Sequence, residues 1–436
     1  MSQEINKAEK QDLSLVVRAI GSDLEHTQVR MIASANADML FHYWKVGHFI
    51  LYLQKKEGWG SKVIDNLSKA IRSQYPDKKG YSRRNIFYMC QFASAYPLEV
   101  LKEMNRIDSL LTTPTVENVL SLTNELNQLV QQPVALIQST DNQSNTITQQ
   151  PVAQLEEVTE TLSTIYHCDI SQIEEIFKHS AIVRTNWASH VILLNSKLPL
   201  GECYWYITQA VANGWSRNVL QMQIESNLFA RQITTTKVSN FSVRLPKPQS
   251  DLANYLMKDP YIFDMMGHTD KMAERDIERQ LVSHITKYLL EMGNGFAFVA
   301  QQKHFEVGDS DFYADLILYN IQLHAYVVIE LKATPFKPEY MGQLNFYINV
   351  VDDTLRGEHD NKTIGLLLCN GGDKVVAQYA LSGYDQPIGV SDYQLSKAIP
   401  DNLKSVLPTV EEVEEELCRI IDNIPPKKVI QNKSYE

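Results

Sequence analysis

The chain has 436 residues, which is too long for a single hydrophobic core and predicts two or three domains. Its 44% hydrophobic and 21% charged residues are typical of a globular protein and exclude wholesale disorder. No apolar run reaches about 18 residues and the N-terminal segment is polar, so we expect no membrane span or secretory signal. The five cysteines are scattered and never paired as C-x-x-C, which predicts reduced thiols, no structural zinc and a cytoplasmic location.

The net charge of −11 does not favour nucleic-acid binding, which draws on a basic surface to displace counterions. The charge is unevenly distributed, however. Residues 54–84 carry nine basic and three acidic side chains, a local charge of +6, whereas five glutamates lie within residues 411–416. The net charge therefore does not exclude a local nucleic-acid interface.

The N-terminal segment, residues 12–107, has apolar positions at spacings of three and four and is predicted to be a helical domain. Within it, Ser82 is a favourable N-cap and Pro97 ends the helix that follows. Residues 108–155 are rich in Gln, Asn, Thr and Ser. They predict a polar insert or linker with one helix at about 116–130.

Helical patterning resumes over residues 156–232, which we interpret as the continuation of the N-terminal domain. A turn at Asn213 and Gly214, followed by a helix capped near Ser216, resembles a helix-turn-helix. Gly-containing turns are also common between the helices of plain bundles. Both readings stay open on the sequence alone.

The C-terminal part changes from purely helical to mixed patterning. A polar segment at 233–270 is predicted to be a linker, and residues 401–436 an acidic helical tail. Between them the pattern gives a helix, three strands, a helix and a strand, which predicts an α/β domain with a mixed sheet. The main predicted elements are an amphipathic helix at about 273–292, strands at 296–307, 311–320 and 325–333, a helix after Pro338, and apolar strand-like runs at 363–370 and 388–395.

Two carboxylates and a lysine stand out in the apolar strands. Alternation along 312–319 puts Ala314 and Leu316 on one face and Asp315 on the other, while Glu330 and Lys332 share a face of the next strand. The short connection between the strands predicts antiparallel neighbours, with Asp315 roughly opposite Glu330.

This trio has the chemistry that phosphodiester hydrolysis needs. Two carboxylates bind a hard cation such as Mg²⁺, and a lysine can orient a water or neutralise charge on the phosphate. The alternative is that Glu330 and Lys332 form an exposed pair on an edge strand, since D…E-x-K also occurs by chance. The nearly continuous apolar run 326–332 favours a central strand instead.

At this point the sequence resembles a known family. The runs DFYADLILYN, HAYVVIELKATPFKPEYMGQLNFYINVVDD and TIGLLLC, within 271–395, resemble the nuclease domain of the YhcG family in the PD-(D/E)XK superfamily. The runs YWKVGHFI (43–50) and GYSRRNIFYMCQFASAYP (80–97) are similar to that family's N-terminal domain. The resemblance implies a helical domain followed by a restriction-endonuclease-like mixed-sheet nuclease domain over 271–400.

The resemblance also implies roles for the trio. Asp315 and Glu330 match the superfamily's acidic metal ligands, and Lys332 matches its catalytic lysine. The proline that often precedes the aspartate is replaced by Ala314 here.

Further residues are implied by the same resemblance. Glu278 matches an additional metal ligand on the first core helix, although Glu274, one turn away, could face the site instead. Gln343 and Tyr347 match the Q-x-x-x-Y motif of RecB-like members, and their spacing of four puts them on one helical face. Lys337 is a candidate phosphate contact.

The sequence and the resemblance together predict a Mg²⁺-dependent nuclease, with Mn²⁺ as a substitute, that hydrolyses DNA, RNA being the alternative. The implied settings are DNA repair, mobile-element maintenance and defence. We expect a homo-oligomer with no membrane partner. Three arginines are the candidate contacts to the nucleic-acid backbone: Arg83, Arg84 and Arg217. The alternatives are a non-catalytic nucleic-acid-binding or scaffold protein on a nuclease fold, and a helical region that serves only oligomerisation.

Overall fold

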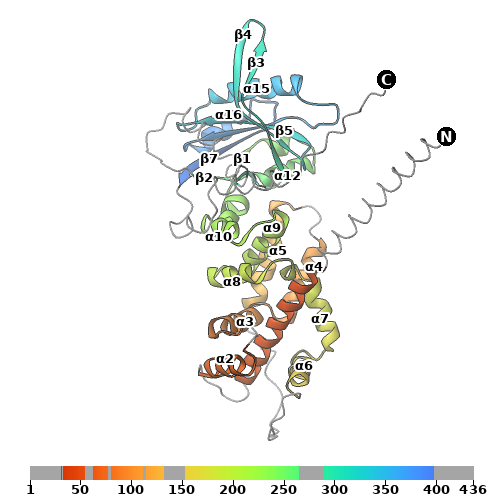
Figure 1. The fold of residues 1–436 in the computed structure, drawn as a ribbon. Helices are drawn as coiled ribbons and strands as arrows, with labels where there is room; N and C mark the ends of the chain where they lie inside the picture. Colours follow the sequence, from red (N-terminus) through yellow and green to blue (C-terminus); the bar gives the residue numbers. More distant parts are fainter. Residues whose placement is uncertain are drawn as a thin grey trace, which may run out of the picture.

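The computed structural model describes residues 31, 33–54, 62–76, 80–110, 114–131, 153–264, 289, 291–293 and 295–396. Helices occupy one end of the elongated molecule and a mixed sheet the other (Figure 1). None of the helices in these ranges is both long and apolar enough to cross a membrane. The predicted Glu278, most of the predicted helix at 273–292 and the predicted tail at 401–436 lie outside the described residues.

The helical part begins with a helix over residues 33–54. The elements that follow are α2 (Lys62–Gln74), α3 (Arg83–Ala95), α4 (Leu98–Leu110), α5 (Val116–Gln131), α6 (Ala153–Tyr166), α7 (Ile170–His179), η2 (Ala181–Arg184), α8 (Trp187–Ser196), α9 (Leu200–Ala212), α10 (Arg217–Glu225) and η3 (Ala230–Thr234). The helix predicted at about 116–130 is α5. Its buried Val119 and Leu126 join the helical core, so this part of the predicted insert belongs to the folded helical part.

Large aromatic side chains form the core of the helical part. Trp44, Phe92 and Phe177 are fully buried, and the ring of Phe177 contacts those of Trp44 and Phe92 at centroid distances of 5.6 and 6.4 Å. The helix over 33–54 approaches α3 so closely that a Cβ at Gly47 would lie 2.1 Å from the carbonyl oxygen of Met89. A glycine is therefore required where these helices cross.

Three helices of this part start at side-chain caps. Ser82, Asn186 and Ser216 each have extended backbone angles and accept a hydrogen bond from the backbone N–H three residues later. These caps fix the starts of α3, α8 and α10. The predicted Ser82 and Ser216 caps are confirmed, and α9 and α10 form the predicted helix pair around the 213–214 turn.

The C-terminal part is a mixed sheet with the order β1-β7-β6-β5-β4-β3, and β2 also pairs with β7. Its strands are β1 (Val238–Ser239), β2 (Tyr261–Asp264), β3 (Phe296–Val307), β4 (Ser310–Asn320), β5 (Ala325–Lys332), β6 (Ile364–Cys369) and β7 (Ile388–Ser396). Strands β3, β4 and β5 are antiparallel neighbours, whereas β5, β6 and β7 run parallel. The predicted mixed sheet and the predicted antiparallel pairing of β4 with β5 are confirmed.

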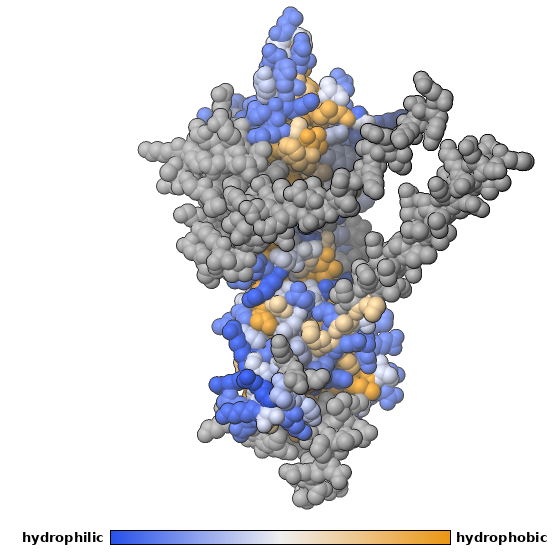
Figure 2. All heavy atoms as spheres, viewed as in Figure 1, coloured by the Kyte–Doolittle hydropathy of each residue, from blue (hydrophilic) through white to orange (hydrophobic). Residues whose placement is uncertain are grey.

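Helices cover both faces of the sheet. One face packs against α11 (Phe241–Arg244) and α12 (Gln249–Leu256), and the other against α15 (Tyr340–Thr354) and α16 (Lys374–Leu381). Parallel strands need such cover on both faces, which explains why β6 reads as an unbroken apolar run. The β3–β4 hairpin projects beyond this sandwich (Figure 1). Figure 2 shows it as largely hydrophilic on the viewed face, with hydrophobic residues gathered at its base.

The segment predicted to be a linker, residues 233–270, contributes to the sheet instead. Val238 pairs with Val390 in the β1–β7 ladder, and Tyr261 pairs with Tyr393 in the β2–β7 ladder. The polar residues that suggested a linker lie partly in the connections and partly in the elements themselves, such as Ser239 in β1 and Gln249 in α12. Two- and four-residue strands are too short to give a period, so the sequence pattern did not reveal them.

Candidate active site

The β4–β5 pair brings the two predicted carboxylates together. The ladder ends at Leu316 opposite Ile329, so Asp315 and Glu330 come opposite each other one step beyond it. The carboxylate of Asp315 also crosses to β5, where its Oδ2 accepts a hydrogen bond of 3.0 Å from the backbone N–H of Leu331. This contact holds the aspartate against the neighbouring strand.

The predicted alternation along β4 fails at this point. Ala314 packs on the α15 side with Ile317, whereas Leu316 and Leu318 pack on the α12 side. The strand period is therefore interrupted next to Asp315. On the adjacent strand, Gln302 has a left-handed φ of 45°. The β3–β4 register shifts a little earlier, between Phe298 and Ala300.

Glu330 is fully buried in the central strand β5. Its Oε2 accepts a hydrogen bond of 3.2 Å from Nζ of Lys332, while its Oε1 has no hydrogen-bond partner among the described residues. Burial, followed by the nearby charge of Asp315, raises the pKa of Glu330 to about 8, and Lys332 acts against this shift. A buried carboxyl with an unpartnered oxygen is costly, which points to a ligand at that oxygen.

The two carboxylates fit a divalent cation. Asp315 and Glu330 offer only oxygen atoms, the donors that Mg²⁺ and Mn²⁺ accept, and they repel each other until a positive charge lies between them. Within the described ranges, no cluster of three or more His, Cys, Asp or Glu side chains could complete a metal site. Glu278, the predicted third ligand, lies outside those ranges.

Helix α15 brings two more predicted residues to the same face of the sheet. Tyr347 is buried, hydrogen-bonds with the side chain of Gln343, and lies near Glu330. Burial is the main reason why the pKa of Tyr347 is raised. Gln343 is exposed, so its amide can reach both Tyr347 and a ligand outside the protein. The Q-x-x-x-Y spacing thus places Tyr347 near the carboxylates and Gln343 beside Tyr347.

Tyr340, at the start of α15, lies between two lysines. Nζ of Lys332 lies 5.6 Å from the centroid of the Tyr340 ring, and Nζ of Lys337 lies 5.9 Å from it. Lys337 is more than half exposed, and its Nζ lies 3.8 Å from a carboxylate oxygen of Glu339. Lys337 therefore lies at the rim of the site, near the same Tyr340 ring as Lys332, the predicted catalytic lysine.

The structure adds Gln302, a residue that the sequence analysis did not select. Its Nε2 donates a hydrogen bond of 3.2 Å to Oδ1 of Asp315, so both carboxylate oxygens of Asp315 have a donor. A glutamine in an exposed, irregular strand gives no sequence signal. Only the β3–β4 pairing places it there.

The three predicted arginines lie in the helical part and have different surroundings. Arg83 is paired with Asp65 of α2, with 2.8 Å between Nε and Oδ1. Arg84 and Arg217, from α3 and α10, line one cavity of about 330 Å³. The structure thus brings two of the three together, far along the sequence from the carboxylates.

Comparisons with known proteins agree with both parts of this architecture. Residues 254–408 match the family described as "YhcG PDDEXK nuclease domain", and residues 19–124 match the "DUF1016 N-terminal domain". The first match includes the carboxylates, the lysine and α15.

Parts of the chain are also similar to individual proteins. The chain is 27% identical over 213 residues to "Putative nuclease YhcG" of Escherichia coli strain K12, which covers 48% of this chain and 57% of that relative's length. It is also similar to a solved structure, the crystal structure of a repair endonuclease from Pyrococcus abyssi. That similarity has 14% identity and a TM-score of 0.21, and it covers 30% of this chain and 50% of the other. The chain thus combines a region that matches the YhcG PDDEXK nuclease domain with a preceding region that matches the DUF1016 N-terminal domain.

Proposed function

We propose that this protein is a metal-dependent nuclease that hydrolyses phosphodiester bonds in DNA at the β4–β5 site. The observation that carries the proposal is the fully buried Glu330, whose Oε1 lacks a partner in the described structure beside Asp315 and Lys332. A structural ion pair would not need a second carboxylate at this position. A cation site needs both.

Asp315 and Glu330 would hold Mg²⁺ or Mn²⁺, with Glu278 as the expected third ligand. When bound, the cation would polarise the phosphate and lower the pKa of a water. Glu330 also anchors Lys332, whose ammonium is confined between that carboxylate and the ring of Tyr340. From this position Lys332 donates a hydrogen bond to the attacking water or to the phosphate oxygen on which charge develops.

Residues on α15 position the substrate in this proposal. Gln343 and Tyr347 share one helical face and hydrogen-bond with each other, so together they can orient one phosphate group. Lys337, exposed at the rim, supplies a contact to the neighbouring phosphate. In the helical part, Arg84 and Arg217 contact the nucleic-acid backbone. The biological setting is repair, mobile-element maintenance or defence.

A cleavage assay tests this function. Wild-type protein is incubated with linear, circular and branched DNA and with RNA, in Mg²⁺, in Mn²⁺ and in EDTA. We expect metal-dependent cleavage of DNA that is lost in Asp315→Ala and Lys332→Ala. If the wild type cuts no substrate, or both variants cut as well as the wild type, the protein is a non-catalytic nucleic-acid-binding or scaffold protein instead.

A further inference from the structure

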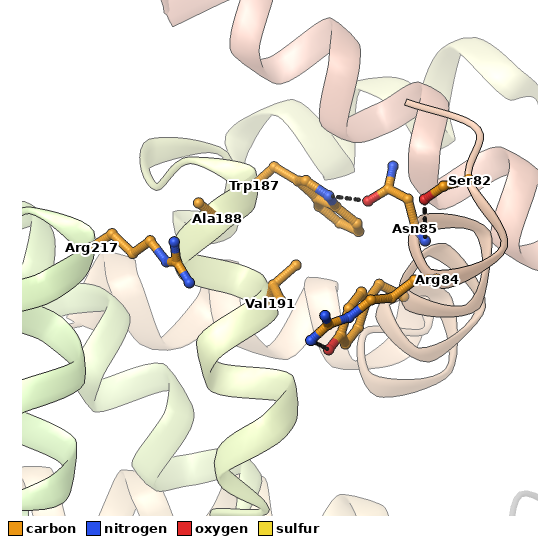
Figure 3. A pocket seen from close by; sticks show the side chains of 8 residues that line it. Ser82, Arg84, Asn85, Trp187, Ala188, Val191 and Arg217 are labelled. Atoms are coloured by element: carbon orange, nitrogen blue, oxygen red, sulfur yellow. Dashed lines mark hydrogen bonds between the residues drawn. The ribbon is translucent and has the colours of Figure 1, made fainter. Parts of the chain in front are cut away.

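A cavity in the helical part lies between the starts of α3, α8 and α10. It has a volume of about 330 Å³, at the lower end of the range of about 300–1,000 Å³ found for small-ligand sites. Figure 3 shows Arg84 and Arg217 reaching into it from opposite sides, with Ala188 and Val191 between them. A space of this size can hold one nucleotide unit.

The two arginines give this cavity a positive charge that no carboxylate offsets. Neither Arg84 nor Arg217 pairs with an acidic side chain of the described structure, and no described residue that lines the cavity is acidic. Arg84 donates a hydrogen bond of 3.3 Å to the hydroxyl of Tyr88, which holds its guanidinium at the cavity wall. Two opposed guanidinium groups are the arrangement that binds a phosphate group.

An aromatic side chain forms another wall. The indole Nε1 of Trp187 donates a hydrogen bond of 2.7 Å to Oδ1 of Asn85, which fixes the ring on α8 against α3 (Figure 3). Tyr43 and Phe92 support the same ring with edge-on contacts at centroid distances of 4.8 and 5.4 Å. The indole is therefore held in place before any ligand arrives, and a fixed aromatic ring beside a phosphate site is suited to stacking a base.

The direction of the helices adds to the positive potential. Ser82 caps α3, Asn186 caps α8 and Ser216 caps α10, and each cavity-lining segment belongs to the first turns of its helix. The N-terminal end of a helix carries a partial positive charge and favours a nearby anion. Three such ends, two guanidinium groups and an indole therefore meet at one cavity.

We infer that this cavity binds a single unpaired nucleotide of a nucleic-acid strand, with its phosphate between Arg84 and Arg217 and its base against Trp187. The helical part therefore prefers single-stranded segments or frayed ends to continuous duplex. The inference rests on the proposed nuclease function in one respect: that function identifies the bound polymer as a nucleic acid. Binding itself requires neither the metal nor the β4–β5 site.

The test measures binding by full-length Asp315→Ala protein in EDTA, so that cleavage plays no part. The probes are a short labelled single-stranded DNA, the blunt duplex of the same sequence, and a nucleoside monophosphate as competitor. We expect the single strand to bind more tightly than the duplex. Arg84→Ala and Arg217→Ala should each weaken single-strand binding about tenfold or more, the order expected for hydrogen bonds to a charged group. Each should also lower the salt dependence by about one phosphate contact.

Two matched pairs of variants separate this inference from a loss of folding. Arg83→Ala, on the same helix but paired with Asp65, should bind like the parent. Ala188→Glu places a carboxylate in the cavity at the start of α8, where a negative charge suits the helix, so the protein should fold and lose binding. Ala188→Gln, the neutral isostere, should retain binding.

Three results would overturn the inference: equal losses in Arg83→Ala and Arg84→Ala, equal affinity for duplex and single strand, or Ala188→Glu binding like Ala188→Gln. If the arginine variants lose affinity for the monophosphate but not for the oligonucleotide, the cavity binds a free nucleotide and the assignment to a nucleic acid fails. The proposed nuclease function fails independently, through the cleavage assay.

Discussion

Lys332 and Glu330, two residues apart on strand β5, form an ion pair of 3.2 Å between Nζ and Oε2 inside the nuclease domain. The pair satisfies only one oxygen of the glutamate, and the like charge of Asp315 lies on the other side. This arrangement costs stability, because the single ammonium of Lys332 does not neutralise two neighbouring carboxyl groups.

Because the charge of Asp315 beside Glu330 costs stability, Asp315→Asn should change both the cleavage rate and the free energy of unfolding. The amide keeps the shape and can still accept the hydrogen bond from Leu331, but it removes the charge beside Glu330. We expect cleavage to fall at least about 100-fold. In urea unfolding without divalent metal, the free energy of unfolding should rise by about 1 kcal/mol. Asp311→Asn, an exposed change on the same strand, is the control and should alter neither quantity. If Asp315→Asn cuts at the wild-type rate, the assignment of Asp315 to the catalytic site is wrong.

Gln302 is predicted to position Asp315. Gln302→Gly removes the hydrogen bond to Oδ1 of Asp315, and glycine accommodates the φ of 45°. We expect the Mg²⁺ concentration for half-maximal cleavage to rise about tenfold, the effect typical of losing a residue that orients a metal ligand. A metal titration of the cleavage rate measures this shift. Gln301→Gly, one residue earlier at a regular ladder position, weakens the strand at least as much but removes no bond to Asp315, so it should not show this shift. An equal shift in both variants would mean a general loss of strand order.

Gly365 is predicted to set the position of α15 over the sheet. A Cβ at this residue of β6 would lie 2.5 Å from Cδ1 of Ile348, so Gly365→Ala must displace that side chain. We expect the free energy of unfolding to fall by about 1–3 kcal/mol and cleavage to fall as well, because α15 carries Gln343 and Tyr347. Adding Ile348→Val, which shortens the displaced side chain, should restore part of both losses. Gly383→Ala meets no atom within 4 Å and is the control. Failure of Ile348→Val to rescue would contradict this account.

Two buried histidines predict acid sensitivity of the helical part. Burial lowers the pKa of His48 to about 3 and that of His190 to about 4, from an ordinary value of 6.5. Because the folded values are depressed, neither residue changes the free energy of unfolding above pH 6.5, where it is neutral in both states. Below pH 6.5 the unfolded state binds protons that the folded state does not, so this free energy falls as the pH decreases toward 4. Each should lower the free energy of unfolding by about 2 kcal/mol between pH 7 and pH 5.

Urea unfolding monitored by tryptophan fluorescence at both pH values checks this expectation. His190→Gln should reduce the pH-dependent loss by about half, whereas His179→Gln, an exposed change, should leave it unaltered. A loss of the same size in His190→Gln and wild type would show that another group carries the acid sensitivity.

The sequence by itself predicted the candidate site residues and determined the order of the elements around them. Strand-like apolar runs placed Asp315 and Glu330 on neighbouring strands, because strand patterning is a local property of the chain. The interruption of the alternation between Ala314 and Leu316 was not visible in the sequence. The spacing of four likewise placed Gln343 and Tyr347 on one helical face, and the strong caps Ser82 and Ser216 fixed two helix starts.

Only the tertiary structure decided the contacts between segments that are distant in sequence. The β3–β4 pairing brings Gln302 to Asp315, and the helical packing brings Arg84 and Arg217 to one cavity while Asp65 engages Arg83. The short strands β1 and β2 gain their identity from pairing with β7, because their own residues are too few to show a period. Local patterns follow from neighbours along the chain, whereas these relationships depend on long-range packing, which no local pattern encodes.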